Sequence, residues 1–182
     1  MKNLILPIGL LAATLLFLTS LKALDQPLSL LMADNTAKVK PQHQTKVKGF
    51  KTNIQKDAIE NKNFRKVLYT AKHLQLVLMS LKPGEEIGAE THAKSDQFFR
   101  FEGGSGKCII NETVYTVKDG DVIIAPAGSK HNVINTDPHQ DLKLYTIYAI
   151  PQHKDGIIRV TKKEAEQQEA KFDGKTTEKD VQ

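Results

Sequence analysis

The feature that most constrains this chain is a succession of short apolar runs between residues 65 and 150, separated by glycine- and proline-rich breaks. The runs have the length of β-strands, and the breaks are of the kind that reverse the chain in tight turns. Many short strands joined in this way are typical of an all-β sandwich or barrel. The expected strands cover residues 65–70, 74–81, 97–101, 107–110, 113–117, 122–124, 132–134 and 142–150.

The sequence on either side of this region has a different texture. Residues 24–63 show no sustained period and are rich in polar side chains, which predicts a polar linker with one short helical turn at residues 56–60. After Pro151 the pattern is helical, because Thr161 and Glu164 form a capping-box signature. The chain is therefore divided into a signal segment, a linker, a barrel and a C-terminal helix with a tail, at residues 1–23, 24–63, 64–151 and 152–182.

The first 23 residues have the pattern of an export signal. An apolar run covers residues 4–18, and small residues lead to Ala23, where a signal peptidase could cut; Ala33 is a second candidate. The run is near the lower length limit for crossing a bilayer, and Pro7 weakens it as an anchor. We expect cleavage and a periplasmic or secreted protein, with membrane contact only if the segment is not cleaved.

Charge and cysteine content narrow the classes of function. The formal net charge of +5 is mild, and the lysines at positions 38–51 are better explained by a solvated tether than by a nucleic-acid surface. We therefore expect no nucleic-acid partner. The single cysteine, Cys108, excludes an intrachain disulfide, and its place in an apolar run predicts a small core residue.

Two glycine-bounded segments concentrate the side chains that can bind a metal ion. In the first, Glu90 and His92 are two residues apart and so project from the same face of a strand, and Gln97 begins the next expected strand. In the second, residues 120–135, a tight corner leads to His131 at the start of a strand.

The spacing of these residues resembles the two motifs of the cupin superfamily. The first motif, Gly-x5-His-x-His-x(3,4)-Glu-x6-Gly, is matched at Gly84 and His92 and closed by a glycine at 103 or 104. It has Glu90 where the family usually has His, and Gln97 where the family usually has Glu. The second, Gly-x5-Pro-x-Gly-x2-His-x3-Asn, is matched at every defined position, by Gly120, Pro126, Gly128, His131 and Asn135.

The flanking residues 63–70 and 172–176 resemble a subgroup of single-domain bacterial cupins, often labelled mannose-6-phosphate isomerase-like. The resemblance implies an all-β fold, a single cupin jelly-roll β-barrel with a short C-terminal helix after the N-terminal signal segment. Many family members pair through barrel strands, so a homodimer is also expected.

The resemblance further implies one divalent metal ion held by the four motif side chains Glu90, His92, Gln97 and His131. Their chemistry agrees, because two imidazoles, a carboxylate and an amide oxygen suit Zn, Mn, Fe, Ni or Cu. Gln97 would be the weakest donor, and a metal-free barrel with a polar pocket is the alternative. The other histidines lack such spacing and are expected at the surface: His43, His73, His139 and His153.

Alternation along the strands predicts which residues surround this site. Counting from Gln97 places Phe99 and Phe101 on the ligand face, and counting along the last long run places Tyr148 inward. Phe99, Phe101 and Tyr148 are therefore candidate pocket walls, with simple core packing as the alternative.

Taken as a site, these residues favour a metal-dependent enzyme that acts on a small polar molecule such as a carbohydrate or an organic acid. The metal would serve an isomerase, epimerase or lyase step as a Lewis acid, with Glu90 as a general base. Two histidines and a carboxylate also match the facial triad of non-haem iron dioxygenases. A barrel that binds or senses a small ligand without turnover is a third hypothesis.

Overall fold

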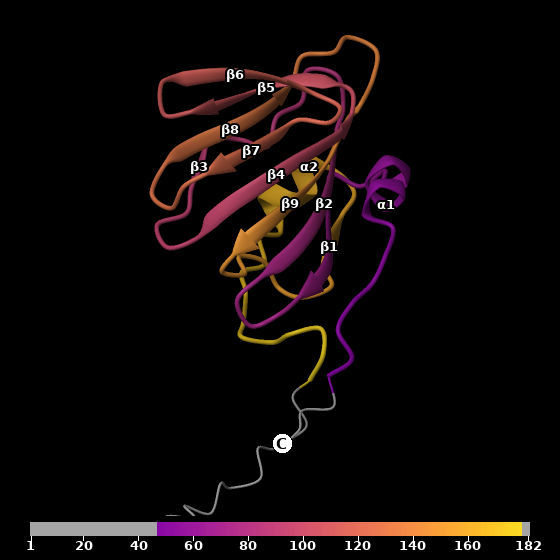
Figure 1. Ribbon diagram of the computed structural model, residues 1–182, viewed down its shortest axis with the longest axis vertical. Helices are drawn as coiled ribbons and strands as arrows, with labels where there is room; N and C mark the ends of the chain where they lie inside the picture. The colour runs from indigo at the N-terminus through magenta and orange to yellow at the C-terminus, as the bar shows by residue number, and fades with distance from the viewer. Residues whose placement is uncertain (1–46, 180–182) are drawn as a thin grey trace, which may run out of the picture. The chain divides into compact units, whose positions relative to one another are not determined.

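Two antiparallel β-sheets form the framework of residues 47–179, the part of the chain that the computed structural model describes (Figure 1). The larger sheet has the strand order β10-β1-β2-β9-β4-β7, and the smaller has the order β3-β8-β5-β6. The strands are β1 (Arg65–Thr70), β2 (Gln75–Leu81), β3 (Glu90–Thr91), β4 (Asp96–Gly103), β5 (Ser105–Ile110), β6 (Thr113–Lys118), β7 (Val122–Ala125), β8 (Lys130–Asn135), β9 (Leu142–Ala149) and β10 (Ile158–Arg159).

The expected signal segment, residues 1–23, lies outside the described residues, as does His43. Among the helices of residues 47–179, none combines the length and the apolar composition needed to cross a membrane.

Side-chain alternation agrees with the prediction from the sequence. On β4, Phe99 and Phe101 are fully buried, whereas Phe98 is only partly buried. On β9, the inward positions are Leu142, Leu144, Thr146 and Tyr148, all fully buried. This period of two produces the core, because the inward faces of the two sheets supply its apolar side chains. Cys108 on β5 belongs to this core, as predicted.

The expectation of a closed barrel is corrected by the hydrogen bonding. Within residues 47–179 the strands form two separate ladders, and no strand is shared between the two sheets. The sheets instead meet through side chains, since Phe99, Phe101 and Leu144 from the larger sheet and Cys108 and Val133 from the smaller belong to one core cluster. A jelly-roll needs only this face-to-face packing, so its inward-facing positions are the same as in a closed barrel.

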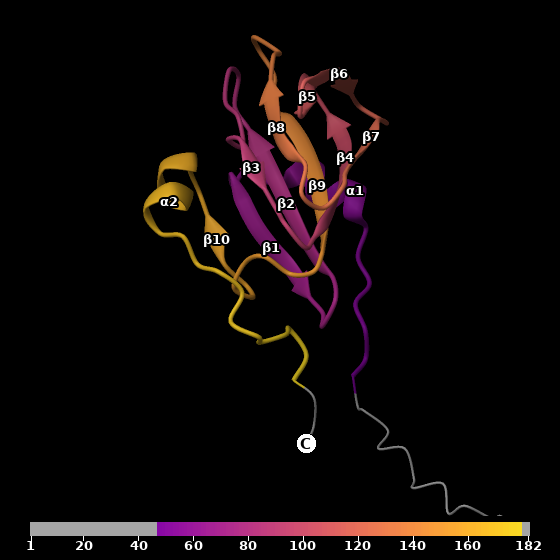
Figure 2. The same cartoon turned by 90° about the vertical axis from the view of Figure 1, so that its left-hand side faces the viewer.

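Two short helices complete the structure. α1 (Ile54–Glu60) lies in the segment expected as a linker, and its Ala58 is fully buried. α2 (Lys162–Gln167) begins as the capping signature predicts, because the hydroxyl of Thr161 accepts a hydrogen bond of 3.2 Å from the N–H of Glu164. α2 follows β10 in the sequence, and β10 pairs with β1 at the edge of the larger sheet (Figure 2).

Candidate metal centre

Side chains from both sheets converge on one point. Glu90 lies on β3 and His92 directly follows it, while the antiparallel pairing of β3 with β8 sets Glu90 opposite His131. Gln97 comes from β4 of the larger sheet and is fully buried. All four predicted ligands are therefore brought together, although they span 42 positions of the sequence from Glu90 to His131 if both ends are counted.

The corner at residues 126–128 explains how two distant histidines are aligned. The N–H of Gly128 donates a 2.9 Å hydrogen bond to the carbonyl of His92. One residue later, the carbonyl of Ser129 lies 3.0 Å from Nδ1 of His131. Gly128 has a φ of +82°, a left-handed conformation that a residue with a side chain rarely adopts. The proline-glycine corner thus positions both imidazoles through the backbone.

The donor atoms are spaced as one metal ion requires. Oε1 of Glu90 lies 3.2 Å from Nε2 of His92 and 3.4 Å from Nε2 of His131. Donors about 2.0–2.2 Å from one ion, at angles of roughly 90–110°, stand about 3.0–3.5 Å apart. Oε1 of Gln97 lies 2.8 Å from Nε2 of His131. Glu90, His92 and His131 therefore form a cluster that could hold one metal ion.

The hydrogen bonds around the cluster leave its lone pairs facing inward. Because Nδ1 of His131 donates to the Ser129 carbonyl, Nε2 is the ring nitrogen that faces the oxygens of Glu90 and Gln97, and its lone pair becomes available to the site when it gives up its proton. The amide of Gln97 donates from Nε2 to the hydroxyl of Thr146 at 3.0 Å, which turns its oxygen toward the site. A cation between these atoms would satisfy them all.

Two buried atoms of the cluster lack hydrogen bonds altogether. Among the described residues, neither Oε1 of Glu90 nor Nε2 of His92 has a partner of acceptable geometry. Buried polar atoms are rarely left in this state, and an absent ion is one of the few explanations. The residues present therefore fit a divalent metal ion.

The charges within the cluster stabilise one another. Burial alone would raise the pKa of Glu90, but the imidazoles of His131 and His92 beside its carboxylate hold that pKa well below its ordinary value. Burial alone would lower the pKa of His131, but the neighbouring carboxylate of Glu90 and the hydrogen bond to the Ser129 carbonyl raise it. Glu90 is thus an ionised carboxylate, and the His131 imidazole beside it has an increased affinity for a proton.

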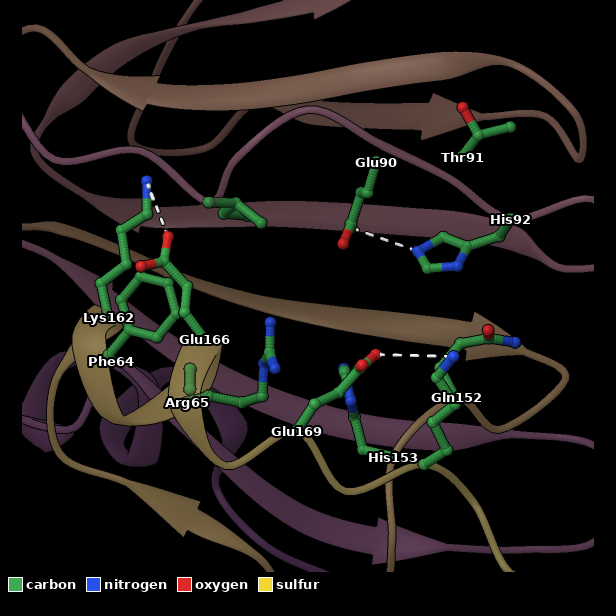
Figure 3. A pocket seen from close by; sticks show the side chains of 13 residues that line it. Phe64, Arg65, Glu90, Thr91, His92, Gln152, His153, Lys162, Glu166 and Glu169 are labelled. Carbon is green, nitrogen blue, oxygen red and sulfur yellow. Dashed lines mark ion pairs between the residues drawn. The ribbon is translucent and has the colours of Figure 1, made fainter.

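A cavity of about 530 Å³ adjoins the cluster (Figure 3). Glu90 and His92 form part of its wall, and the opposite side is formed by α2 through Lys162, Ala165 and Glu166. A volume of this size suits a small molecule.

The three candidate pocket walls lie behind the ligands. The ring of Phe99 packs edge-on against His131 with 5.8 Å between centroids, and Tyr148 packs edge-on against His92 at 5.3 Å. Phe101 lies in the hydrophobic core. All three are fully buried, and within the described residues the lining of the cavity includes none of them. Their aromatic contacts fix the imidazole rings from the core side.

Of the histidines expected at the surface, His73 and His139 are exposed, but for His153 the expectation was wrong. His153 is 8% exposed and lines the cavity. The side-chain amide of Gln75 donates to the backbone carbonyl of His153 and accepts from its backbone N–H. Nε2 of the His153 ring lies 3.3 Å from the hydroxyl of Tyr148. Burial, followed by the charge of Arg65, lowers its pKa to about 3, so it is neutral.

The sequence also missed Arg65, which lines the same cavity. The sequence predicted that Arg65 begins a strand. Only the pairing of β1 with β2 and β10, however, brings this residue next to the cavity. No local pattern could have signalled either Arg65 or His153.

The cupin domain family matches residues 77–148, which include all four predicted ligands. Residues 77–148 of this chain are a cupin domain. Within the cupin pattern it keeps His92 and His131 and substitutes Glu90 and Gln97.

Similar proteins are known from other organisms. The chain is 44% identical over 124 residues to the uncharacterised protein YrkC of Bacillus subtilis, covering 65% of this chain and 66% of that one. It is 40% identical over 111 residues to an uncharacterised protein of Acanthamoeba polyphaga mimivirus, covering 59% and 69%. The matches thus span about two thirds of these curated relatives.

Among solved structures, the crystal structure of BH2720 from Bacillus halodurans is similar to this cupin, with a TM-score of 0.64 and 42% identity. The match covers 65% of this chain and 93% of that chain. None of these three relatives is named for an activity, so the isomerase-like label of the subgroup stays a prediction.

Proposed function

We propose that this cupin binds one divalent metal ion and is a metal-dependent enzyme acting on a small polar substrate, by isomerase, epimerase or lyase chemistry. The observation that carries the proposal is the convergence of Glu90, His92 and His131, two of whose buried donor atoms lack hydrogen bonds in the described structure. The adjoining cavity supports an enzyme rather than a purely structural metal site, because it leaves room for a small molecule beside Glu90 and His92.

In this proposal the residues of the chain divide the work. Glu90, His92 and His131 would hold the metal ion, which supplies Lewis-acid polarisation of a substrate oxygen. Gln97 would be an exchangeable fourth donor, held in orientation by Thr146. Glu90, with a side chain that is 22% exposed, is the carboxylate available to accept a substrate proton.

The experiment that tests metal binding is elemental mass spectrometry of protein purified without chelators or a histidine tag. We expect close to one metal ion per chain, lost in both His92→Ala and His131→Ala. His139→Ala is the matched control, because His139 is exposed and is not part of the cluster. No bound metal after reconstitution with Zn, Mn, Fe, Ni and Cu in turn would overturn the proposal.

A dioxygenase is the second candidate, and the ligand set itself favours it. Two histidines and one carboxylate are the donors of the non-haem iron facial triad, which leaves positions open for other ligands. Dioxygen uptake by Fe-loaded protein with an organic acid present would support this function. Product formation from the same panel with Zn or Mn, and without dioxygen, would support the isomerase or lyase function instead. Ligand binding without product would indicate a sensing module.

A further inference from the structure

Arg65 is a buried cation with no anion. It is 9% exposed, and its guanidinium makes no hydrogen bond or ion pair with any residue of the described part of the chain. Its Nε is fully buried and unsatisfied. The aromatic ring of Phe64 lies beneath the guanidinium, 5.8 Å from ring centroid to Cζ. A buried charge without a partner is costly, so the arrangement indicates a missing anionic ligand.

The other cations around the cavity are already neutralised. Lys162 lies 3.4 Å from Glu86 and 3.7 Å from Glu166, and Lys171 lies 3.9 Å from Glu169. Among the described residues that line the cavity, Arg65 is therefore the one cation without a carboxylate partner.

The Arg65 side chain is directed at the place where a substrate would lie. Figure 3 shows its guanidinium pointing into the cavity, on the side from which Glu90 approaches. A guanidinium presents parallel N–H donors that match a carboxylate in a bidentate pair. A ligand between Arg65 and the cluster would thus have one negative end and one polar end.

We propose that Arg65 anchors the carboxylate of the substrate, so that the substrate class is a small organic acid rather than a neutral sugar or a sugar phosphate. This inference rests on the proposed function, since it places the acidic end of the substrate in the same cavity that Glu90 and His92 line. A single uncompensated cation balances a single carboxylate. A phosphate dianion would bring excess negative charge beside Glu90, Glu166 and Glu169, which line the same cavity.

The test is isothermal titration of the full-length, metal-loaded protein with monocarboxylates of two to six carbons, each compared with its primary amide. We expect a subset of the acids to bind and their amides not to bind. Arg65→Gln should weaken that binding about 100-fold, and Arg65→Lys about 10-fold because it keeps the charge but loses the fork. Equal binding of acid and amide, or tighter binding of inorganic phosphate or glucose 6-phosphate, would overturn the proposal.

The matched control is Lys66→Gln. It removes the same charge from the next residue of β1, which alternation directs to the opposite face. Acid binding by Lys66→Gln should equal that of the wild type. An equal loss in both variants would assign the effect to net charge and overturn the anchor role.

The stability of the ligand-free protein distinguishes a ligand-binding arginine from a structural one. Without ligand, Arg65→Gln and Arg65→Met should unfold at the same denaturant midpoint as the wild type or at a higher one, because each removes an unpaired buried charge. A lower midpoint in both variants would show that Arg65 is structural. Metal content should be unchanged in both variants. Wild-type protein that binds no metal would overturn the proposed metal site. Metal-loaded wild-type protein that binds no carboxylate would overturn only the anchor role of Arg65.

Discussion

At the scale of single residues, His131 shows how backbone geometry prepares a metal ligand. The Ser129 carbonyl accepts a hydrogen bond from Nδ1 of His131, so Nε2 is the ring nitrogen that can bind a metal ion. Glu90 and Gln97 both present oxygens to that nitrogen. In the absence of metal the same place can be occupied only by a proton, so metal ions and protons compete for His131.

This competition predicts opposite pH dependences for the two forms. In metal-free protein the raised pKa of His131 adds stability that is complete below its ordinary value of 6.5 and is lost as the pH rises through its folded pKa. The lowered pKa of Glu90 adds stability above its ordinary value of 4.5, which is lost as the pH falls through its folded pKa. Metal-free protein should thus be most stable between these two values.

Metal-loaded protein should instead gain stability as the pH rises toward 8, because its ligands must be deprotonated. Urea unfolding at pH values from about 5 to 8, with EDTA or with saturating metal, measures both curves. His131→Ala should abolish the difference between them, and a difference that persists in this variant would contradict the assignment.

Gln97 makes a second prediction at this scale. Gln97→Glu restores the usual cupin residue but buries a second carboxylate beside Glu90. Without metal, the variant should lose roughly 3 kcal/mol of unfolding free energy, because two buried carboxylates would then share the single imidazole of His131 and repel each other. With saturating metal, the loss should shrink or reverse. Gln140→Glu, at an exposed position, is the control, and an equal loss with and without metal would place Gln97 outside the site.

At the scale of elements, the approach of β5 to β8 fixes the smaller sheet. Gly106 on β5 faces Asn135 on β8, and the same pairing extends to Ile110 opposite His131. A Cβ at Gly106 would collide with the backbone carbonyl of Ile134 and lie 2.9 Å from Cδ2 of Leu142. The absence of a side chain at Gly106 therefore allows the strand that carries His131 to approach its neighbour.

Gly106→Ala should accordingly destabilise the protein by roughly 2 kcal/mol or more and weaken metal binding through a displaced β8. Gly103→Ala is the matched control, because the nearest atom to its Cβ would be the end of the Ile59 side chain at 3.2 Å, and no backbone atom lies among its close contacts. Thermal unfolding and metal titration of both variants check the prediction. Equal effects of the two substitutions would contradict it.

At the scale of the whole molecule, Cys108 reports on opening of the core. It is the single cysteine of the chain, it is fully buried between the sheets, and burial raises its pKa to about 11. Its thiol can therefore react only when the two sheets separate.

Alkylation of Cys108 should be slow in native protein and should slow further when metal is bound. At a free metal concentration 100 times the dissociation constant, the folded state gains about 2.7 kcal/mol, which lowers the open population about 100-fold. The rate of iodoacetamide labelling, followed by mass spectrometry with and without metal, measures this protection. His131→Ala should show no metal effect; protection that survives in this variant would place the metal elsewhere.

Much of the fold and the four ligands could be predicted from the sequence, because both depend on local periodicity and fixed spacing. The strand of residues 65–70 coincides with β1, and Thr161 caps α2 as expected. Glu90 and His92 share a face because strand side chains alternate, and the corner before His131 follows from proline and glycine.

Tertiary structure decided what depends on pairing between distant strands. The choice of two sheets over a closed barrel is set by which edges meet, and no local period specifies that. His153 and Arg65 reach the cavity from segments whose own patterns are ordinary, through pairing with β2 and β10 and the clamp of Gln75. Burial and charge pairing are properties of such assembled surroundings, and for that reason the uncompensated charge of Arg65 emerges only in the folded chain.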